Sequence, residues 1–436
     1  MSLNYYISLL WVCLNFLILA QENTVHALLS LEECQKLALE YSPTLKTEGN
    51  NLLKKELNYK FSKRYWHPSL SAYGSYNLNF GRRVDQFTNT FSNSIVHSNS
   101  WGASLNMSIF NGLRNKRTVE INNLTSLTQK AKIEENKITL KRKVTETYFL
   151  ILEKQISVEI SNLKIDDITN QVNRNNQLAQ EGRSNRLDSL IFVNQQMTEL
   201  ANLNSVKQLL RKDILNLNLL INHPLLDTLV AKVPIVDLSK MNSFLLKDDA
   251  SVFANEQLAL QIKSAELELR KAKGSYSPTL SLSGSIGTGF STNNLDYSVT
   301  PNELKPYGRQ LNENLYESVG LNLSIPIYSK GENKRAVELA KINIENSKIL
   351  KDDLLKTQEQ QVQLRKFEFY YLIRNRDLIQ EQNIRDLEIF NLTKELFEKG
   401  RINQFEYEVA RNKYFQSKLN LKMIHLSLSK IVTLYH

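Results

Sequence analysis

Four segments of the chain alternate apolar and polar residues with a period of two, the pattern of a β-strand with one apolar and one polar face. They cover about residues 69–80, 101–109, 279–290 and 318–327. One face of each segment is apolar, and the other carries mostly Ser, Asn, Thr and Gly without any charged residue. Each run has about 10–13 residues, the length that a tilted strand needs to cross a bilayer.

An ordinary antiparallel sheet with one solvated face would show the same alternation. The four segments, however, form two hairpins far apart in the sequence, at residues 68–110 and 278–327, and no comparable alternation occurs elsewhere. We therefore predict membrane-crossing strands whose polar tips run from Gly81 to Asn99 and from Ser291 to about Asn314. Four strands cannot close a barrel, and lipid-exposed edges leave backbone groups unpaired. Several chains must then share one barrel.

The remaining chain has the pattern of unusually long helices. Residues 113–180 and 332–399 contain neither Pro nor Gly, and a helix over such a stretch would extend roughly 100 Å. Apolar positions recur at steps of three and four, which predicts coiled-coil packing. In the last helix the predicted packing positions are Tyr407, Ala410, Tyr414, Ser417, Leu421, Ile424, Leu428, Ile431 and Tyr435.

The chain is also an internal repeat. The segment Asn115–Glu120 returns as Asn333–Glu338, 218 residues later, and Leu178–Asn185 returns at the same offset as Leu396–Asn403. A repeat of this length indicates duplication and pseudo-symmetry. We expect a first repeat at residues 28–221, a linker at 222–247 and a second repeat at 248–436.

The repeated segments contain the turns between paired helices. Gly182 and Gly400 suit the left-handed conformation that ends a helix. Asn185 and Asn403 can cap the start of the helix that follows. The sequence therefore predicts a tight helix reversal at each glycine.

The N-terminus has a different character. Residues 7–20 are apolar except for Ser8 and Asn15, and this run is too short for a spanning helix, which needs about 20 residues. It is typical of a secretory signal peptide, with two alternative cleavage sites, after Ala20 and after Ala27. Cleavage would remove Cys13 and leave Cys34 as a single thiol, which forms neither an intramolecular disulfide nor a zinc site.

Charge and motifs exclude several function classes. The net charge is +10, but Lys and Arg are dispersed among 45 acidic residues, so we expect no nucleic-acid partner. We find no metalloprotease, nucleophile-elbow or phosphate-loop motif, and the glycine-rich run at 284–289 lies within an alternating strand. No enzymatic activity, cofactor or metal site is expected.

The order of helix, hairpin, long helix, tight turn and helix, given twice, resembles the TolC-like family of outer-membrane efflux channels. The opening segment Leu31–Pro43 is similar to the first helix of that family, and Ile109–Gly112 is similar to its strand-to-helix exits. In the second repeat, Ile325–Tyr328 occupies this place without the glycine, and Gly331 follows a few residues later.

This resemblance implies an α+β membrane protein that forms a homotrimer. Three chains would share a twelve-stranded β-barrel embedded in outer-membrane lipid, with a long α-helical coiled-coil barrel in the periplasm. The family places acidic residues where the helical tunnel narrows at the turns. Asp188 and Glu406 match one such position, and Glu408 lies beside Val409 where a second acid is expected. Acids in the first turn of a helix are also favoured by the helix dipole, so both roles stay open.

The resemblance further implies that Gly182, Arg183, Gly400 and Arg401 at the helix turns meet a periplasmic adaptor protein. The expected function is a passive exit duct in the outer membrane of a Gram-negative bacterium, serving a tripartite efflux or type I secretion system. Docking of the adaptor and an inner-membrane pump would open it. The alternative is a soluble periplasmic coiled-coil adaptor or scaffold, which would not require the two hairpins.

Overall fold

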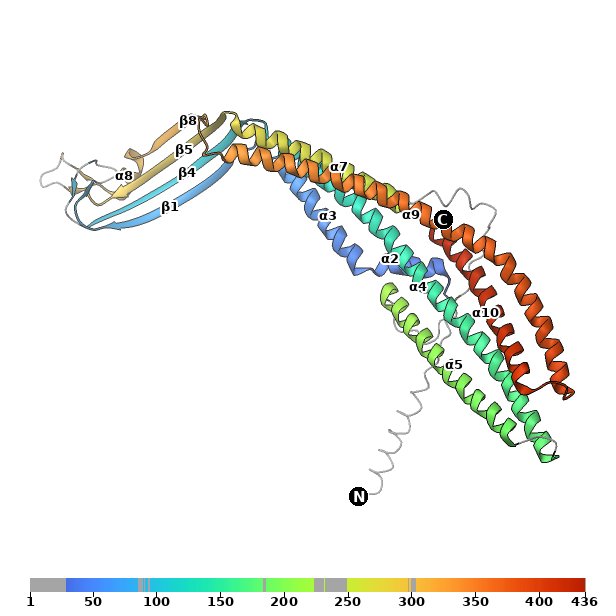
Figure 1. Ribbon diagram of the computed structural model, residues 1–436. Coiled ribbons are helices and arrows are strands. Elements are labelled where there is room, and N and C mark those ends of the chain that lie inside the picture. Colours follow the sequence, from blue (N-terminus) through green and yellow to red (C-terminus); the bar gives the residue numbers. More distant parts are fainter. Residues whose placement is uncertain are drawn as a thin grey trace, which may run out of the picture. The chain divides into compact units, whose positions relative to one another are not determined.

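The computed structural model describes residues 29–84, 89, 91–92, 95–182, 186–222, 231, 249–296, 298 and 303–435 (Figure 1). The predicted signal peptide and almost all of the predicted linker lie outside these residues. The chain divides into two compact units. The first, which we call the sheet unit, consists of the described residues within 49–132 and 255–353. The second consists of the described residues within 1–48, 133–254 and 354–436. We call it the tip unit because it contains the helix turns at Gly182 and Gly400, and it is distinct from the hairpin tips of the sheet. Each unit therefore combines segments of both predicted repeats.

The sheet unit contains one four-stranded antiparallel sheet with the order β1, β4, β5, β8. Its strands are β1 (Ser69–Asn79), β4 (Val96–Asn111), β5 (Thr279–Ser291) and β8 (Tyr316–Ser324). The two predicted hairpins are present, and β4 also pairs with β5, so that they form a continuous sheet with an irregularity between Ser108 and Phe110. The outer strands are β1 and β8 (Figure 1).

The strand register sorts apolar and polar residues onto opposite faces, as the alternation predicts. One row across the four strands consists of Leu70, Leu105, Gly284 and Val319. The next row, on the other face, consists of four serines: Ser71, Ser104, Ser285 and Ser318. The hydroxyl oxygens of Ser71 and Ser104 lie 2.8 Å apart, and those of Ser285 and Ser318 lie 2.7 Å apart. These serine hydroxyl groups therefore form hydrogen bonds with each other across neighbouring strands of the polar face.

The strand ends differ from the prediction. Strand β4 begins at Val96, which pairs with Asn79, so the last residues of the predicted Gly81–Asn99 tip belong to the strand. Strand β8 ends at Ser324 instead of residue 327 because Pro326 lacks the backbone N–H that a ladder needs. The tips also contain short paired strands: β2 (Arg83–Val84) with β3 (Phe91–Ser92), and β6 (Leu295–Asp296) with β7 (Glu303–Leu304).

The second tip contains a short helix, α8 (Tyr307–Glu313), which packs against β5. The side-chain oxygen of Gln310 accepts a hydrogen bond from the backbone N–H of Ser291 at 3.0 Å. The side-chain amide of Asn314 donates to the carbonyl oxygen of Gly289 at 2.7 Å. Gln310 in the helix and Asn314 at its C-cap thus form hydrogen bonds with backbone groups of β5 in the part of that strand that β8 does not reach.

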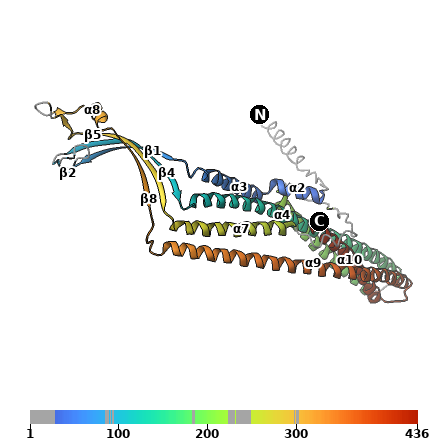
Figure 2. The ribbon, with the colours of Figure 1, turned by 90° about the horizontal axis from the view of Figure 1, so that it is seen from above.

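Each strand of the sheet is joined to one helix of the same unit, and these helices lie side by side (Figure 2). They are α3 (Pro43–Ser62), α4 (Arg114–Gln180), α7 (Asp249–Lys273) and α9 (Glu332–Glu398), each with at least part of its length in the unit. Helices α4 and α9 have 67 residues each, and both ends of α9 lie 218 residues after those of α4. The internal repeat is therefore reproduced to the residue in these helices.

The repeated asparagines fix the start of both long helices. The side-chain amide of Asn115 donates to the carbonyl oxygen of Tyr65 at 3.3 Å, and that of Asn333 donates to the carbonyl oxygen of Ser275 at 3.1 Å. In each repeat the bond reaches the segment that leads into the first strand of the hairpin, β1 or β5. The conserved place of Asn in the two copies therefore has a structural reason.

The tip unit contains α2 (Leu31–Tyr41), α5 (Arg186–Ile221), α10 (Gln404–Tyr435) and the later parts of α4 and α9. Its largest apolar core joins α2, α4 and α5 around Cys34, Tyr148, Phe149 and Leu217. Burial raises the pKa of the Cys34 thiol to about 11. Six of the packing positions predicted in α10 are buried: Tyr407, Ala410, Ser417, Ile424, Leu428 and Ile431. None of the described helices combines the length and the apolar character of a membrane span.

Candidate functional site

The turn at Gly400 closes α9 in the way that the sequence predicts. Gly400 has a φ of +69°, which places it in the left-handed region. Its N–H donates to the carbonyl oxygen of Phe397 at 3.0 Å, and the N–H of Arg401 donates to that of Leu396 at 2.9 Å. These two bonds form a Schellman motif, which satisfies the last carbonyl groups of the helix. The side chain of Arg401 is exposed at this turn.

The turn at Gly182 closes α4 similarly. Gly182 has a φ of +70°, and its N–H donates to the carbonyl oxygen of Ala179 at 3.1 Å. Helix α5 begins at Arg186. Residues 183–185 lie outside the described residues, so the adaptor-docking role predicted for Arg183 stays a prediction.

The predicted acidic residues have local roles at the start of α10. The carboxylate of Glu406 accepts a hydrogen bond from the N–H of Asn403 at 3.3 Å, and the N–H of Glu406 donates to the side-chain oxygen of Asn403 at 2.9 Å. This reciprocal pair is a capping box. Glu406 is exposed, and Glu408 accepts a hydrogen bond from Gln404 at 2.8 Å. The side chain of Asp188 is outside the described part, and the pore-constriction role of the three acids stays a prediction.

A buried polar contact near this tip joins helices from both repeats. The hydroxyl of Tyr407 in α10 donates a hydrogen bond of 2.6 Å to Oδ2 of Asp167 in α4. The side-chain amide of Gln171 donates to the same hydroxyl at 3.3 Å, and Nζ of Lys394 in α9 lies 3.8 Å from Oδ1 of Asp167. Burial, together with the charge of Asp167, raises the pKa of Tyr407. The phenol therefore stays protonated and acts as a donor.

Aromatic and basic side chains surround this contact. The ring of Tyr407 stacks on that of Phe397, with centroids 4.9 Å apart and planes 19° apart. The side chain of Arg411 is buried, and its Nη1 makes no hydrogen bond within the described part of the chain. Nη2 of Arg174 donates to the carbonyl oxygen of Glu398 at 2.5 Å, next to the turn. We call Asp167, Gln171, Lys394, Phe397, Tyr407 and Arg411 the tyrosine cluster.

Sequence reasoning identified Tyr407 only as an apolar packing position. Its partner Asp167 lies 240 residues earlier, so no local pattern connects the two. A phenol at a packing position of a long helix was the one available sign, because a buried Tyr usually requires a hydrogen-bond partner. The described residues contain no group of three or more His, Cys, Asp or Glu that could hold a metal ion.

Comparisons with known proteins agree with this architecture. A family model described as "Outer membrane efflux protein" matches residues 35–223 and 256–431, which is most of the chain. The unmatched residues between these segments include all but the first two residues of the predicted linker. A search among curated proteins finds no match.

Solved structures show the same fold at low sequence identity. The CmeC outer-membrane channel of Campylobacter jejuni is 14% identical, with a TM-score of 0.78 over 93% of this chain and 84% of that one. The outer-membrane protein VceC of Vibrio cholerae is 11% identical, with a TM-score of 0.74 over 93% of both chains. The MtrE outer-membrane channel of Neisseria gonorrhoeae is 16% identical, with a TM-score of 0.68 over 93% and 87%.

The fold of these channels confirms the predicted combination of antiparallel strands and long coiled-coil helices. The family match confirms the resemblance to TolC-like channels and favours the membrane hypothesis over a soluble adaptor. The chain therefore belongs to the outer membrane efflux protein family and is an outer-membrane exit channel.

Proposed function

We propose that three copies of the chain pool their sheets into one closed barrel in the outer membrane, while their helices enclose a periplasmic tunnel. The duct performs no chemistry, and it opens when a periplasmic adaptor, itself bound to an inner-membrane pump, docks at the helix tips. It serves a tripartite efflux or type I secretion system. The observation that carries the proposal is a four-stranded sheet with two outer strands that pair with nothing else in the described chain.

The two outer strands have the right direction to pair with each other between copies. Every neighbouring pair in the sheet is antiparallel, so β8 runs opposite to β1. Joining β8 of one copy to β1 of the next therefore continues the antiparallel pattern. Closure supports a barrel because each unpaired backbone group in lipid would cost several kcal/mol.

The apolar face of the sheet suits contact with lipid. Val319 is 83% exposed, and Leu70, Leu321 and Leu323 are also exposed on this face. A soluble protein rarely leaves such an apolar row uncovered. The opposite face, with its serine row, suits a water-filled lumen.

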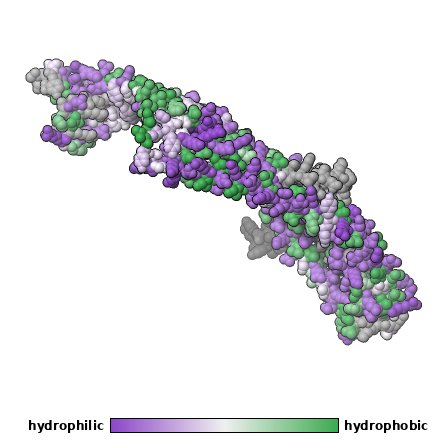
Figure 3. Space-filling view, turned by 45° about the horizontal axis from the view of Figure 1, so that its top comes forward, coloured by the Kyte–Doolittle hydropathy of each residue, from purple (hydrophilic) through white to green (hydrophobic). Residues whose placement is uncertain are grey.

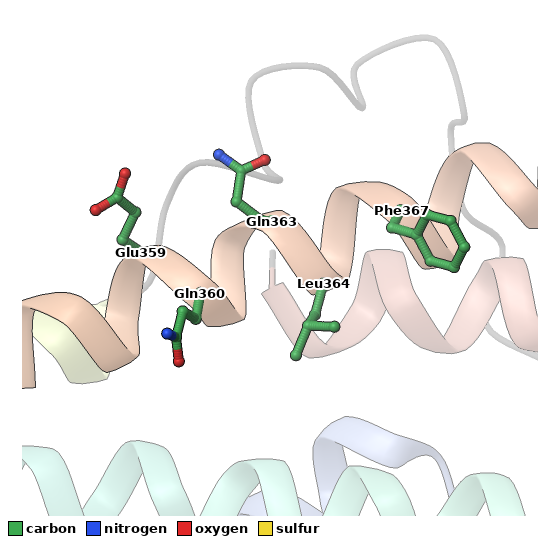
Figure 4. A pocket seen from close by; sticks show the side chains of 5 residues that line it. All are labelled: Glu359, Gln360, Gln363, Leu364 and Phe367. Atoms are coloured by element: carbon green, nitrogen blue, oxygen red, sulfur yellow. The ribbon is translucent and has the colours of Figure 1, made fainter.

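The tip unit also leaves apolar side chains for a second copy to cover. Leu364 and Phe367 on α9 are 66% and 73% exposed. With Glu359, Gln360 and Gln363 they line a shallow groove along this helix (Figure 4). Figure 3 shows apolar side chains mixed with polar ones along the helices, rather than a uniformly polar surface. Contacts between copies along α9 would bury these groups.

The tyrosine cluster supplies a structural basis for opening at the tips. The bond from Tyr407 to Asp167 holds α10 against α4, and adaptor docking at Gly182, Arg183, Gly400 and Arg401 would separate these helices. Asp188, Glu406 and Glu408 would then line the widened constriction and favour cations. The exposure of Arg401 and Glu406 at one turn supports this arrangement.

The proposal is tested by extracting the protein from outer membranes in detergent and measuring its mass by light scattering and native mass spectrometry. We expect a trimer that, reconstituted into planar bilayers, conducts ions in discrete steps. A monomer that remains dissolved without detergent, or a trimer that never conducts, would contradict the proposed duct.

A further inference from the structure

Two tyrosines from the outer strands meet above the polar face of the sheet. The hydroxyl oxygens of Tyr73 in β1 and Tyr316 in β8 lie 3.1 Å apart. The register places Tyr73 opposite Gly102, Gly102 opposite Gly287, and Gly287 opposite Tyr316. The two side chains therefore belong to one row across all four strands, and they reach toward each other from its ends.

The middle of this row requires glycine. A Cβ atom on Gly102 would lie 2.6 Å from the hydroxyl oxygen of Tyr73, and one on Gly287 would lie 2.6 Å from that of Tyr316. Both distances are too short for a real Cβ contact. The tyrosine side chains thus lie directly over the backbone of the two inner strands.

The rows on either side contain small residues. One is the row of four serines, and the other contains Ser75, Ser100 and Gly289. Among the residues paired in the sheet, aromatic rings occur on the polar face only in the Tyr73–Tyr316 row, and no paired residue on this face is charged. The Tyr73–Tyr316 row is therefore a strip of aromatic surface, which we call the ledge, between two rows that contain serine hydroxyl groups.

Such a ledge has a definite chemical preference. The face of an aromatic ring attracts cations, and the attraction is stronger when the cation has lost its water. Phenol and serine hydroxyl oxygens can accept hydrogen bonds but add no charge. Organic cations with apolar substituents fit this surface better than small hydrated ions, because they can shed water at little cost and contact several rings.

We propose that Tyr73 and Tyr316 form a contact site for organic cations in the lumen of the strand section. This inference rests on the proposed trimer, in which three copies place six tyrosines at one level. The site narrows the lumen at that level and slows the passage of cationic, apolar cargo relative to inorganic ions.

The test uses the purified protein in planar bilayers, with tetrabutylammonium or tetraphenylphosphonium added to the side of the hairpin tips. We expect both cations to block the potassium current of the unaltered protein reversibly. The double variant Tyr73→Ser/Tyr316→Ser, which copies the residues of the adjacent rows, should raise the concentration for half-block at least about tenfold. The double variant Tyr73→Phe/Tyr316→Phe keeps the rings and should keep the block.

Tyr76→Ala is the matched control, because Tyr76 lies on β1 but on the apolar face of the sheet. It should leave the block unchanged. An unaltered protein that conducts but is not blocked, or serine variants that are blocked as strongly as the unaltered protein, would overturn the inference and leave the duct intact. If the double serine variant does not assemble, Tyr73→Ser and Tyr316→Ser alone must each weaken the block. An unaltered protein that never conducts would overturn the duct and this site together.

Discussion

The hydroxyl of Tyr407 lies 2.6 Å from Oδ2 of Asp167 and connects the last helix of the chain to the first of its two long helices. The contact is buried, and Gln171 and Lys394 complete it. This buried contact is one of the links between the helix pair of the second repeat and that of the first, together with the ion pair of Lys422 with Glu159. Its strength should influence how readily the two pairs separate.

Tyr407→Phe should weaken this link. The substitution removes the donor and leaves a buried carboxylate with Lys394 at 3.8 Å, which costs about 1–3 kcal/mol. We expect a larger mean conductance in planar bilayers and a lower midpoint in chemical unfolding of the trimer. The matched control is Ser189→Ala, because Ser189 occupies the position of the first repeat that corresponds to Tyr407. This substitution removes an exposed hydrogen bond of 2.8 Å to Asn176. Equal conductance in Tyr407→Phe and the unaltered protein would show that the bond does not hold the tip.

Arginine substitutions on the two faces of β8 should have opposite consequences. Val319→Arg places a charge on the exposed apolar face, which costs about 2–4 kcal/mol near the middle of a bilayer. We expect little trimer in the outer-membrane fraction. Asn322→Arg lies on the polar face of the same strand, where Asn322 donates to Ser283, and it should still assemble. Normal assembly of the Val319 variant would speak against the lipid-facing assignment.

Gly287→Ala should disturb the sheet through the ring above it. The added methyl group would lie 2.6 Å from the hydroxyl oxygen of Tyr316, so the tyrosine must move. We expect a loss of about 1–3 kcal/mol, measured as a lower temperature of trimer dissociation on gels. Adding Tyr316→Ala should recover most of that loss, because the obstacle is gone. If the losses of stability from the two substitutions simply add, the contact with the Tyr316 ring is not the reason that position 287 requires glycine.

Cys34 should react slowly with alkylating agents. Burial raises its pKa to about 11 from the ordinary 9.0, so at pH 8 roughly one hundredth as much thiolate is present as in the unfolded chain. The favourable contribution of the neutral buried thiol is complete below pH 9 and is lost as the pH rises toward 11. Iodoacetamide labelling, followed by peptide mass mapping at pH 8 with and without denaturant, measures this. Fast labelling of Cys34 in the native protein would be inconsistent with its burial.

The strands were predictable because, in a sheet with one apolar and one polar face, the polarity of a residue indicates the face on which its side chain lies. Val319 and Leu321 are apolar and exposed on one face, whereas Ser318 and Asn322 face the other way. The ends of the strands were less predictable. Val96 starts β4 because it pairs with Asn79, and that partner is set by the path of the intervening tip rather than by the alternation.

At the helix tips, the predictable features were those decided within a few residues. Gly182 and Gly400 adopt positive φ angles, and the spacing of Asn403 and Glu406 allows a capping box. The contact of Tyr407 with Asp167 depends on how two distant helices pack, and each residue alone fits many environments. The sequence repeat could not reveal it either, because position 189, which corresponds to Tyr407, is Ser.

Helix α8 has a consequence for the joints between subunits. Gln310 and Asn314 form hydrogen bonds with backbone groups near the C-terminal end of β5, so β8 does not pair with that part of the strand. Strand β8 therefore has only nine residues, whereas β1 has eleven. In the proposed trimer the strand on one side of each joint is therefore shorter than its neighbour. The ladder between subunits stops before β1 does, and three such gaps would make the outer rim the place where the assembled barrel first comes apart.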